Sequence, residues 1–159
     1  MNNPDIPPIK KELLVEASQM TAFKVFTEKM DLWWPRSHHI GKTPVTESVL
    51  EPGVNGRWYT LHEDGSRCDV GHVLEWDPYA QVVLAWQING NYKYDPNLIT
   101  EVEVRFIAEG PKTTTVKFEH KNLGRMSGVK AVAEMDYGWG WILQLYKTHI
   151  ETEIITNNQ

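Results

Sequence analysis

A chain of 159 residues, 41% of them hydrophobic, is long enough to bury one core without a metal or a disulfide, so we expect a single domain. A formal net charge of -5, with no basic cluster beyond Lys10 and Lys11, argues against nucleic acid as a partner. With one cysteine, Cys68, and no apolar run long enough for a signal or a membrane span, the sequence predicts a cytoplasmic protein without membrane insertion.

The two ends of the chain differ in composition from its middle. Residues 1–8 carry three prolines and two asparagines, which is typical of a flexible leader. We expect one domain over residues 9–153, followed by a short tail over residues 154–159.

The first elements of the domain are short. Residues 9–17 mix charge with aliphatic side chains and predict a strand. Ser18 is a good N-cap for a helix over about residues 19–28, and a further helical turn is expected at residues 31–34. Pro35 ends that turn, because proline disfavours the helical conformation of the residue before it.

Six more strands follow, separated by turn residues and, over residues 89–97, by a polar loop. The alternation is clearest near Val102, Val104 and Phe106, which share one face while charged residues take the other. One face of the sheet is therefore predicted to be buried. The six strand segments cover residues 43–52, 56–63, 68–76, 81–88, 99–109 and 113–121.

Residues 131–153 form the one long segment whose apolar residues keep a helical period, with Ser127 as a candidate N-cap. The stripe consists of Val132, Met135, Trp139, Ile142, Leu143, Tyr146 and Ile150. It needs an apolar partner surface, and the preceding strands offer the concave face of an antiparallel sheet. We therefore predict an α+β fold, in which about seven antiparallel strands wrap around a long C-terminal helix.

This order of elements resembles the helix-grip fold of the START-like (SRPBCC) superfamily. Within it, the chain is similar over about residues 9–150 to homologues of the ATPase activator of the ninety-kilodalton heat-shock protein, the AHSA-type domains. The motifs that carry the resemblance are MDLWWP at 30–35, EPGVNGRW at 51–58, GHV at 71–73, TEVEVRF at 100–106, TVKFEH at 115–120 and GWGWIL at 138–143. Lipid carriers, hormone receptors, polyketide cyclases and co-chaperones share the fold, so the resemblance implies a cavity between sheet and helix rather than one activity.

Seven tryptophans are many for one domain, and the predicted inward faces collect several of them. Two interpretations stay open: these rings line an aromatic cavity, or they fill a solid core. The candidate ligand-cavity residues are Trp58, Trp76, Trp86, Phe106, Phe118, His120, Trp139 and Ile142.

The sequence offers little for catalysis, metals or cofactors. His72 and His120 lie on apolar-looking strand faces and are the two candidates for acid-base chemistry, although a buried histidine is more often held by a neighbouring group. His38 and His39 are adjacent, so their side chains diverge, and no nearby cysteine or carboxylate completes a metal site. We predict no metal and no cofactor.

These observations favour a non-catalytic domain that binds a small hydrophobic or aromatic molecule between the sheet and the helix. One alternative is a cyclase, dehydratase or hydrolase that uses His120 or His72. Another is a co-chaperone, but no second domain is predicted, so a chaperone ATPase is not an expected partner. A homodimer and the identity of the ligand stay open.

Overall fold

The structure, a computed structural model, describes residues 6–36, 42–126 and 129–157, with the side chains of the last segment described for 132–152. Its fold is α+β, as predicted, and its elements follow the predicted order. A short 3₁₀-helix, η2, lies between the last strand and the long helix, and the proposed N-cap Ser127 lies outside the described residues. The elements are β1 (Ile9–Val15), α1 (Gln19–Thr27), η1 (Met30–Leu32), β2 (Val45–Leu50), β3 (Arg57–His62), β4 (Arg67–Asp77), β5 (Gln81–Trp86), β6 (Thr100–Gly110), β7 (Thr113–Lys121), η2 (Leu123–Arg125) and α2 (Val129–Asn157).

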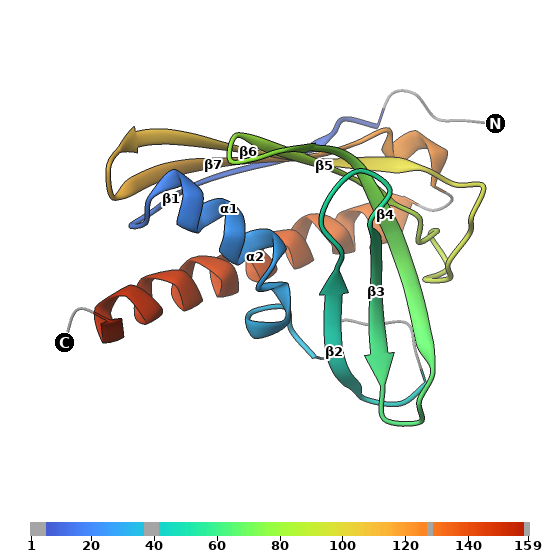
Figure 1. The fold of residues 1–159 in the computed structure, drawn as a ribbon. Coiled ribbons are helices and arrows are strands. Elements are labelled where there is room, and N and C mark those ends of the chain that lie inside the picture. Colours follow the sequence, from blue (N-terminus) through green and yellow to red (C-terminus); the bar gives the residue numbers. More distant parts are fainter. Residues whose placement is uncertain (1–5, 37–41, 127–128, 158–159) are drawn as a thin grey trace.

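The seven strands form one antiparallel sheet in the order β1-β7-β6-β5-β4-β3-β2. The sheet is curled, so that β2 and β3 stand at an angle to β6 and β7, and both helices lie on its concave side (Figure 1). Register shifts interrupt the β3-β4 pairing at Trp58/Tyr59 and the β4-β5 pairing at Val73/Glu75. Because a bulge adds one residue to a strand and bends it, these two shifts place much of the curvature on β4.

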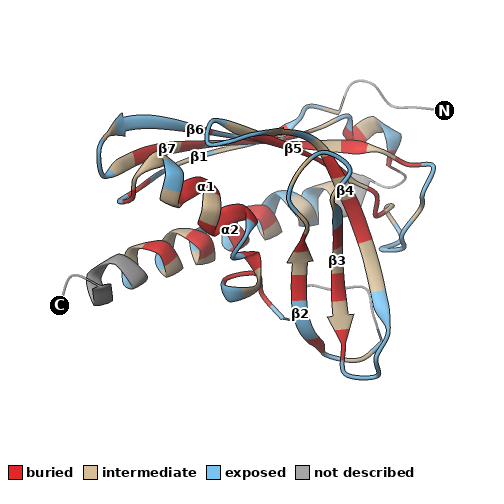
Figure 2. Cartoon of the chain, viewed as in Figure 1, coloured by how far each residue is buried: buried red, intermediate tan, exposed pale blue. Residues whose placement is uncertain are grey.

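The concave face of the sheet and the apolar stripe of α2 enclose the core (Figure 2). In the predicted stripe, Trp139 is 3% exposed, and Tyr146 and Ile150 are fully buried. Helix α1 begins at its predicted N-cap, where the Ser18 hydroxyl accepts a hydrogen bond from the backbone N–H of Thr21. The Tyr146 hydroxyl donates to a carbonyl of α1 over 2.8 Å, which fixes the two helices side by side.

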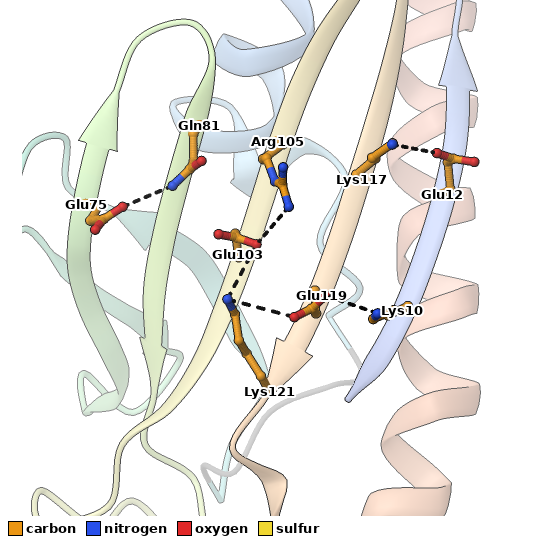
Figure 3. A network of polar contacts seen from close by, with 9 residues as sticks. All are labelled: Lys10, Glu12, Glu75, Gln81, Glu103, Arg105, Lys117, Glu119 and Lys121. Atoms are coloured by element: carbon orange, nitrogen blue, oxygen red, sulfur yellow. Dashed lines mark hydrogen bonds and ion pairs between the residues drawn. The ribbon is translucent and has the colours of Figure 1, made fainter. Parts of the chain in front are cut away.

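The convex face of the sheet is charged and solvated. Ion pairs cross from strand to strand over β1, β7 and β6 (Figure 3). We call this set of ion pairs the ladder; Glu103 and Glu119 are both members of it. The pairs are Lys10–Glu119, Lys117–Glu12, Lys121–Glu103, Lys121–Glu119 and Arg105–Glu103, with N–O distances of 3.5 to 3.8 Å. Exposed pairs of this kind contribute about 0 to 1 kcal/mol each, so the ladder mainly keeps this face in water.

The edge strands β1 and β2 have backbone groups that are occupied by side chains. On β2, the N–H of Ser48 donates to Asp31 Oδ1 over 2.8 Å. On β1, the carbonyl of Leu14 accepts a hydrogen bond from the Lys147 ammonium of α2. Each edge is thus partly closed by a residue from another element.

Gly71 makes room in the middle of the sheet. It lies in β4 directly between Trp58 of β3 and Trp86 of β5, and a Cβ placed on it would come within 1.7 Å of the carbonyl oxygen of Ala85. We expect Gly71→Ala to lower the free energy of unfolding by about 2 to 3 kcal/mol, because the β5 backbone must shift to admit the methyl group. Urea denaturation measures this loss. Gly110→Ala is the control, since a Cβ there meets nothing within 4 Å, and equal stability of the two variants would contradict the prediction.

Candidate functional site

Six ring side chains meet on the concave face, where the sheet approaches the first half of α2. Trp86, the last residue of β5, has its ring centroid 5.5 Å from that of Trp58 on β3 and 5.4 Å from that of Trp139 on α2. Phe118 of β7 lies 4.6 Å from Trp139. We call the set the aromatic cluster; it consists of Trp34, Trp58, Trp86, Phe118, His120 and Trp139.

A chain of hydrogen bonds fixes His120 inside the aromatic cluster. The Trp139 indole donates to His120 Nδ1 over 3.1 Å, and His120 Nε2 lies 2.8 Å from Thr100 Oγ1. An indole N–H can only donate, so Nδ1 is the acceptor and the imidazole proton sits on Nε2. That proton goes to Thr100 Oγ1, whose own hydrogen goes to the carbonyl of Trp86 over 3.0 Å. Every group in the chain is satisfied by a neutral His120.

Burial, like these hydrogen bonds, favours the neutral form of His120. The imidazole is fully buried, and desolvation lowers its pKa to about 3. A histidine that stays neutral at ordinary pH, with both ring nitrogens engaged, holds the cluster together and has no free nitrogen for acid-base chemistry.

His72 lies on the other side of the sheet. Its register partners are Arg57 and Ala85, whereas the next positions along these strands carry the inward-facing Trp58 and Trp86. On the convex face, His72 Nδ1 is 2.8 Å from Gln87 Oε1. The expectation that both candidate histidines face the apolar interior is therefore wrong for His72.

The remaining predicted cavity residues are separate from the aromatic cluster. Phe106 packs edge-on against α1, with its centroid 5.4 Å from that of Phe23, and Trp76 lies 5.1 Å from the same ring. Ile142 is 5% exposed and belongs to the core under α2. Of the eight predicted residues, the structure brings five together: Trp58, Trp86, Phe118, His120 and Trp139.

One polar atom of the aromatic cluster lacks a hydrogen-bond partner among the described residues. The indole N–H of Trp86 is buried and has no hydrogen-bond acceptor among the described residues, although the ring itself is only partly buried. An unsatisfied buried donor costs about 1 to 3 kcal/mol. Trp86 therefore offers a hydrogen bond to any molecule that brings an oxygen to it.

The concave face also has a polar end that the sequence analysis did not single out. On β3, Thr60 Oγ1 lies 2.8 Å from His62 Nε2, and His62 Nδ1 lies 2.7 Å from the carbonyl of Thr43. Across from Thr60, the hydroxyl of Ser48 is buried without a hydrogen-bond partner in the described part of the chain. The alternation of Trp58, Thr60 and His62 was the signal that could have placed these residues inward.

The described residues also bear on metal and membrane sites. They contain no group of three or more His, Cys, Asp or Glu side chains that could hold a metal ion, and His38 and His39 lie outside them. No described helix is long and apolar enough to cross a membrane. A hollow of about 360 Å³ opens among the charged side chains of the convex face, most of which are labelled in Figure 3, and its lining does not suit an apolar ligand.

Comparison with known proteins gives one family and several solved structures. The family described as "Activator of Hsp90 ATPase homolog 1-like protein" matches residues 16–151. CalC from Micromonospora echinospora, a self-sacrificing resistance protein, is 34% identical, with 95% of this chain and 97% of that chain covered and a TM-score of 0.70. Txn09, an anthrahydroquino-γ-pyrone synthase, is 33% identical, with 84% and 88% covered and a TM-score of 0.61.

A more distant structure shares the fold alone. The Aha1 dimer from Colwellia psychrerythraea is 17% identical, with 92% of this chain and 97% of that chain covered and a TM-score of 0.64. Among curated proteins no match was found.

Proposed function

Because the chain belongs to the family of activator of Hsp90 ATPase homolog 1-like proteins, we propose that it uses the concave face of this fold to bind a small, flat aromatic molecule. The ligand lies between the curved sheet and the first half of α2, against the aromatic cluster. Binding, rather than chemistry, is the proposed activity.

The observation that carries the proposal is the Trp86 indole N–H. The rings of the aromatic cluster, whose centroids lie 4.6 to 6.0 Å from those of their neighbours, form an apolar surface for packing, and Trp86 adds a directed hydrogen bond that the described residues do not use. A mostly apolar surface with few, well-placed polar groups is typical of small-molecule sites. The preferred ligand is accordingly a ring system that carries a carbonyl or hydroxyl oxygen.

One of the two relatives, Txn09, supports the same class of ligand. Txn09 is named as a synthase of an anthrahydroquino-γ-pyrone, which is a fused aromatic system bearing ring oxygens, and CalC is named as a resistance protein. Both are more than 30% identical to this chain over most of their length. We extend from Txn09 the ligand class, polycyclic and oxygenated, and not a particular compound.

Two ligands that differ only in the oxygen test the role of Trp86. Wild type is expected to bind anthraquinone more tightly than anthracene, with quenching of tryptophan fluorescence. Trp86→Phe keeps a ring but removes the N–H, so it should weaken anthraquinone binding by about five- to tenfold and leave anthracene binding nearly unchanged, because one hydrogen bond contributes about 1 to 1.5 kcal/mol.

The control variant is Trp141→Phe, which changes a tryptophan on the outer surface of α2 and should alter neither affinity. Equal losses for both ligands in Trp86→Phe would show that the N–H is not the contact. If a wider set of oxygenated polycycles changes neither fluorescence nor melting temperature, the binding function itself is wrong, since a ligand at 100-fold its dissociation constant should stabilise by about 2.7 kcal/mol.

An enzyme is the second candidate, and the synthase relative is the observation that favours it. His120 is an unsuitable acid-base group here, because both of its ring nitrogens are engaged inside the core. Any reaction would then depend on how the site orients a reactive substrate. A His72→Ala variant distinguishes orientation of the substrate from acid-base catalysis by His72. Full turnover of this variant, on a substrate found through the binding screen, would exclude His72 as the acid-base group. A chaperone ATPase as partner has only the family's description behind it.

A further inference from the structure

The outward side of α2 has an unusual composition for a helix surface in water. A line of residues at spacings of four, four, three and four lies opposite the buried stripe, and we call it the outer ridge: Ala133, Tyr137, Trp141, Gln144 and Thr148. All five are exposed, Tyr137 by 82% and Trp141 by 40%. None carries a charge, although the solvent side of an amphipathic helix is normally charged.

The charged residues that flank the outer ridge are turned to partners within the same chain. Asp136 pairs with Lys11 of β1 at 3.0 Å, and Lys147 pairs with Glu151 at 2.9 Å. Glu134 accepts a hydrogen bond from the hydroxyl of Tyr92 in the loop after β5. The ridge is thus neutral, whereas the convex face of the sheet carries the ion-pair ladder of Figure 3.

Aromatic enrichment together with depletion of charge is the composition of an interface core. We infer that the outer ridge of α2 is the contact surface of a homodimer, in which the α2 helices of two copies pack antiparallel across a two-fold axis near residue 139. This inference does not depend on the proposed ligand.

The absence of charge on the outer ridge favours a second copy of this chain as the partner that binds there. A neutral ridge gives no electrostatic complementarity to an acidic or basic partner, while two identical neutral ridges bury no unpaired charge. The two-fold axis also matches the positions of the rings. It sets Tyr137 of each copy against Trp141 of the other, so the aromatic contact is made twice, as an isologous interface requires.

The backbone beside the rings leaves room for such an approach. Gly138 and Gly140 lie on the two flanks of the outer ridge, and a Cβ on Gly138 would meet nothing within 4 Å. The ridge is about 22 Å long, from the rise per residue of a helix, which is short for a standard interface of about 800 Å² per partner. We therefore expect a weak dimer, with a dissociation constant on the order of 10 to 100 µM.

Sedimentation equilibrium over protein concentrations from 5 µM to 1 mM tests the dimer. The average mass should rise from 18.4 kDa toward twice that value. Tyr137→Glu should raise the dissociation constant at least tenfold and leave the melting temperature at 5 µM unchanged, whereas Tyr137→Phe should dimerise like wild type. Val54→Glu is the matched control, because Val54 is a 60% exposed apolar residue in the turn between β2 and β3 and not on α2, and its mass profile should not change.

Crosslinking tests the antiparallel register without touching the rings. In a Cys68→Ser background, Glu134→Cys and Gln144→Cys variants are mixed and oxidised. The two-fold axis near residue 139 brings position 134 of one copy to position 144 of the other, so the mixed disulfide should exceed either symmetric one. Excess of the symmetric products would overturn the register.

A wild type that stays monomeric at 1 mM, a dimer unaffected by Tyr137→Glu, or a monomer that sediments with phosphatidylcholine vesicles would overturn the inference.

Discussion

Trp139→Ala is expected to lower the free energy of unfolding by about 3 to 5 kcal/mol, the range for removing a buried aromatic side chain. Trp139 is 3% exposed and contacts Trp34, Phe118 and Trp86 at centroid distances of 4.6 to 5.8 Å. Its loss leaves a cavity and also leaves His120 Nδ1 without a donor. Urea denaturation followed by circular dichroism measures the change, which is a large part of a typical domain's 5 to 15 kcal/mol.

Two further variants separate the contributions. Trp139→Phe keeps a ring but removes the N–H to His120, and it should cost less than Trp139→Ala. Gly138→Ala, next to it on the helix, should stabilise by about 0.5 to 1 kcal/mol, because alanine is the better helix former and its methyl group meets nothing within 4 Å. A Trp139→Ala protein that melts within a degree or two of wild type would show that the cluster is not the centre of the core.

Mild acid is expected to destabilise the protein through His120. Its pKa in the folded protein is about 3, lowered by burial from the ordinary 6.5, so below pH 6.5 the unfolded chain binds a proton that the folded protein does not. This stabilisation is complete above pH 6.5 and is lost as the pH falls toward 3, at about 1.4 kcal/mol per pH unit. Between pH 7 and pH 5 the free energy of unfolding should drop by about 2 kcal/mol.

His120→Gln isolates the effect. The amide offers one acceptor and one donor and does not titrate, so the variant should lack this part of the slope between pH 7 and pH 5. Asp31 does not contribute to the slope between pH 7 and pH 5. Burial raises the pKa of this carboxyl, but hydrogen bonds from Arg36 and Ser48 outweigh burial, so the pKa lies below 3.8 and below the tested pH range. Parallel curves for wild type and His120→Gln would mean that His120 is charged in the folded protein.

The long helix and the order of the strands could be predicted because their patterns extend over many residues. The helix was expected over residues 131–153 and is found over Val129–Asn157, with Trp139 and Ile142 inward as predicted. The inward positions of β6 and β7 followed equally from unbroken alternation.

The orientation of His72 could not be predicted, for a physical reason. Counting back in twos from the inward Trp76 puts His72 on the same face, but the bulge between Val73 and Glu75 inserts one residue. A single extra residue turns every earlier side chain of the strand to the other face. Bulges leave no reliable mark in the amino-acid sequence, so only the register of β4 with β5 shows it.

The aromatic cluster was predictable in part. Trp58, Trp86 and Phe118 followed from strand alternation, but Trp34 comes after the 3₁₀-helix η1, where no period applies. The hydrogen bond from Trp139 to His120 joins two elements whose relative rotation is set by packing. The sequence could therefore indicate which aromatic residues belong to the site but not the hydrogen bonds among its polar groups.

The occupied backbone groups at the two edges of the sheet also bear on how the protein behaves when it is crowded. An exposed edge strand is a template on which a second polypeptide can add a strand, which is the first step toward fibrils. Asp31 already holds the N–H of Ser48, and Lys147 already holds the carbonyl of Leu14. An incoming strand would have to displace these side chains before its own first hydrogen bonds formed, so growth from either edge is obstructed at its start.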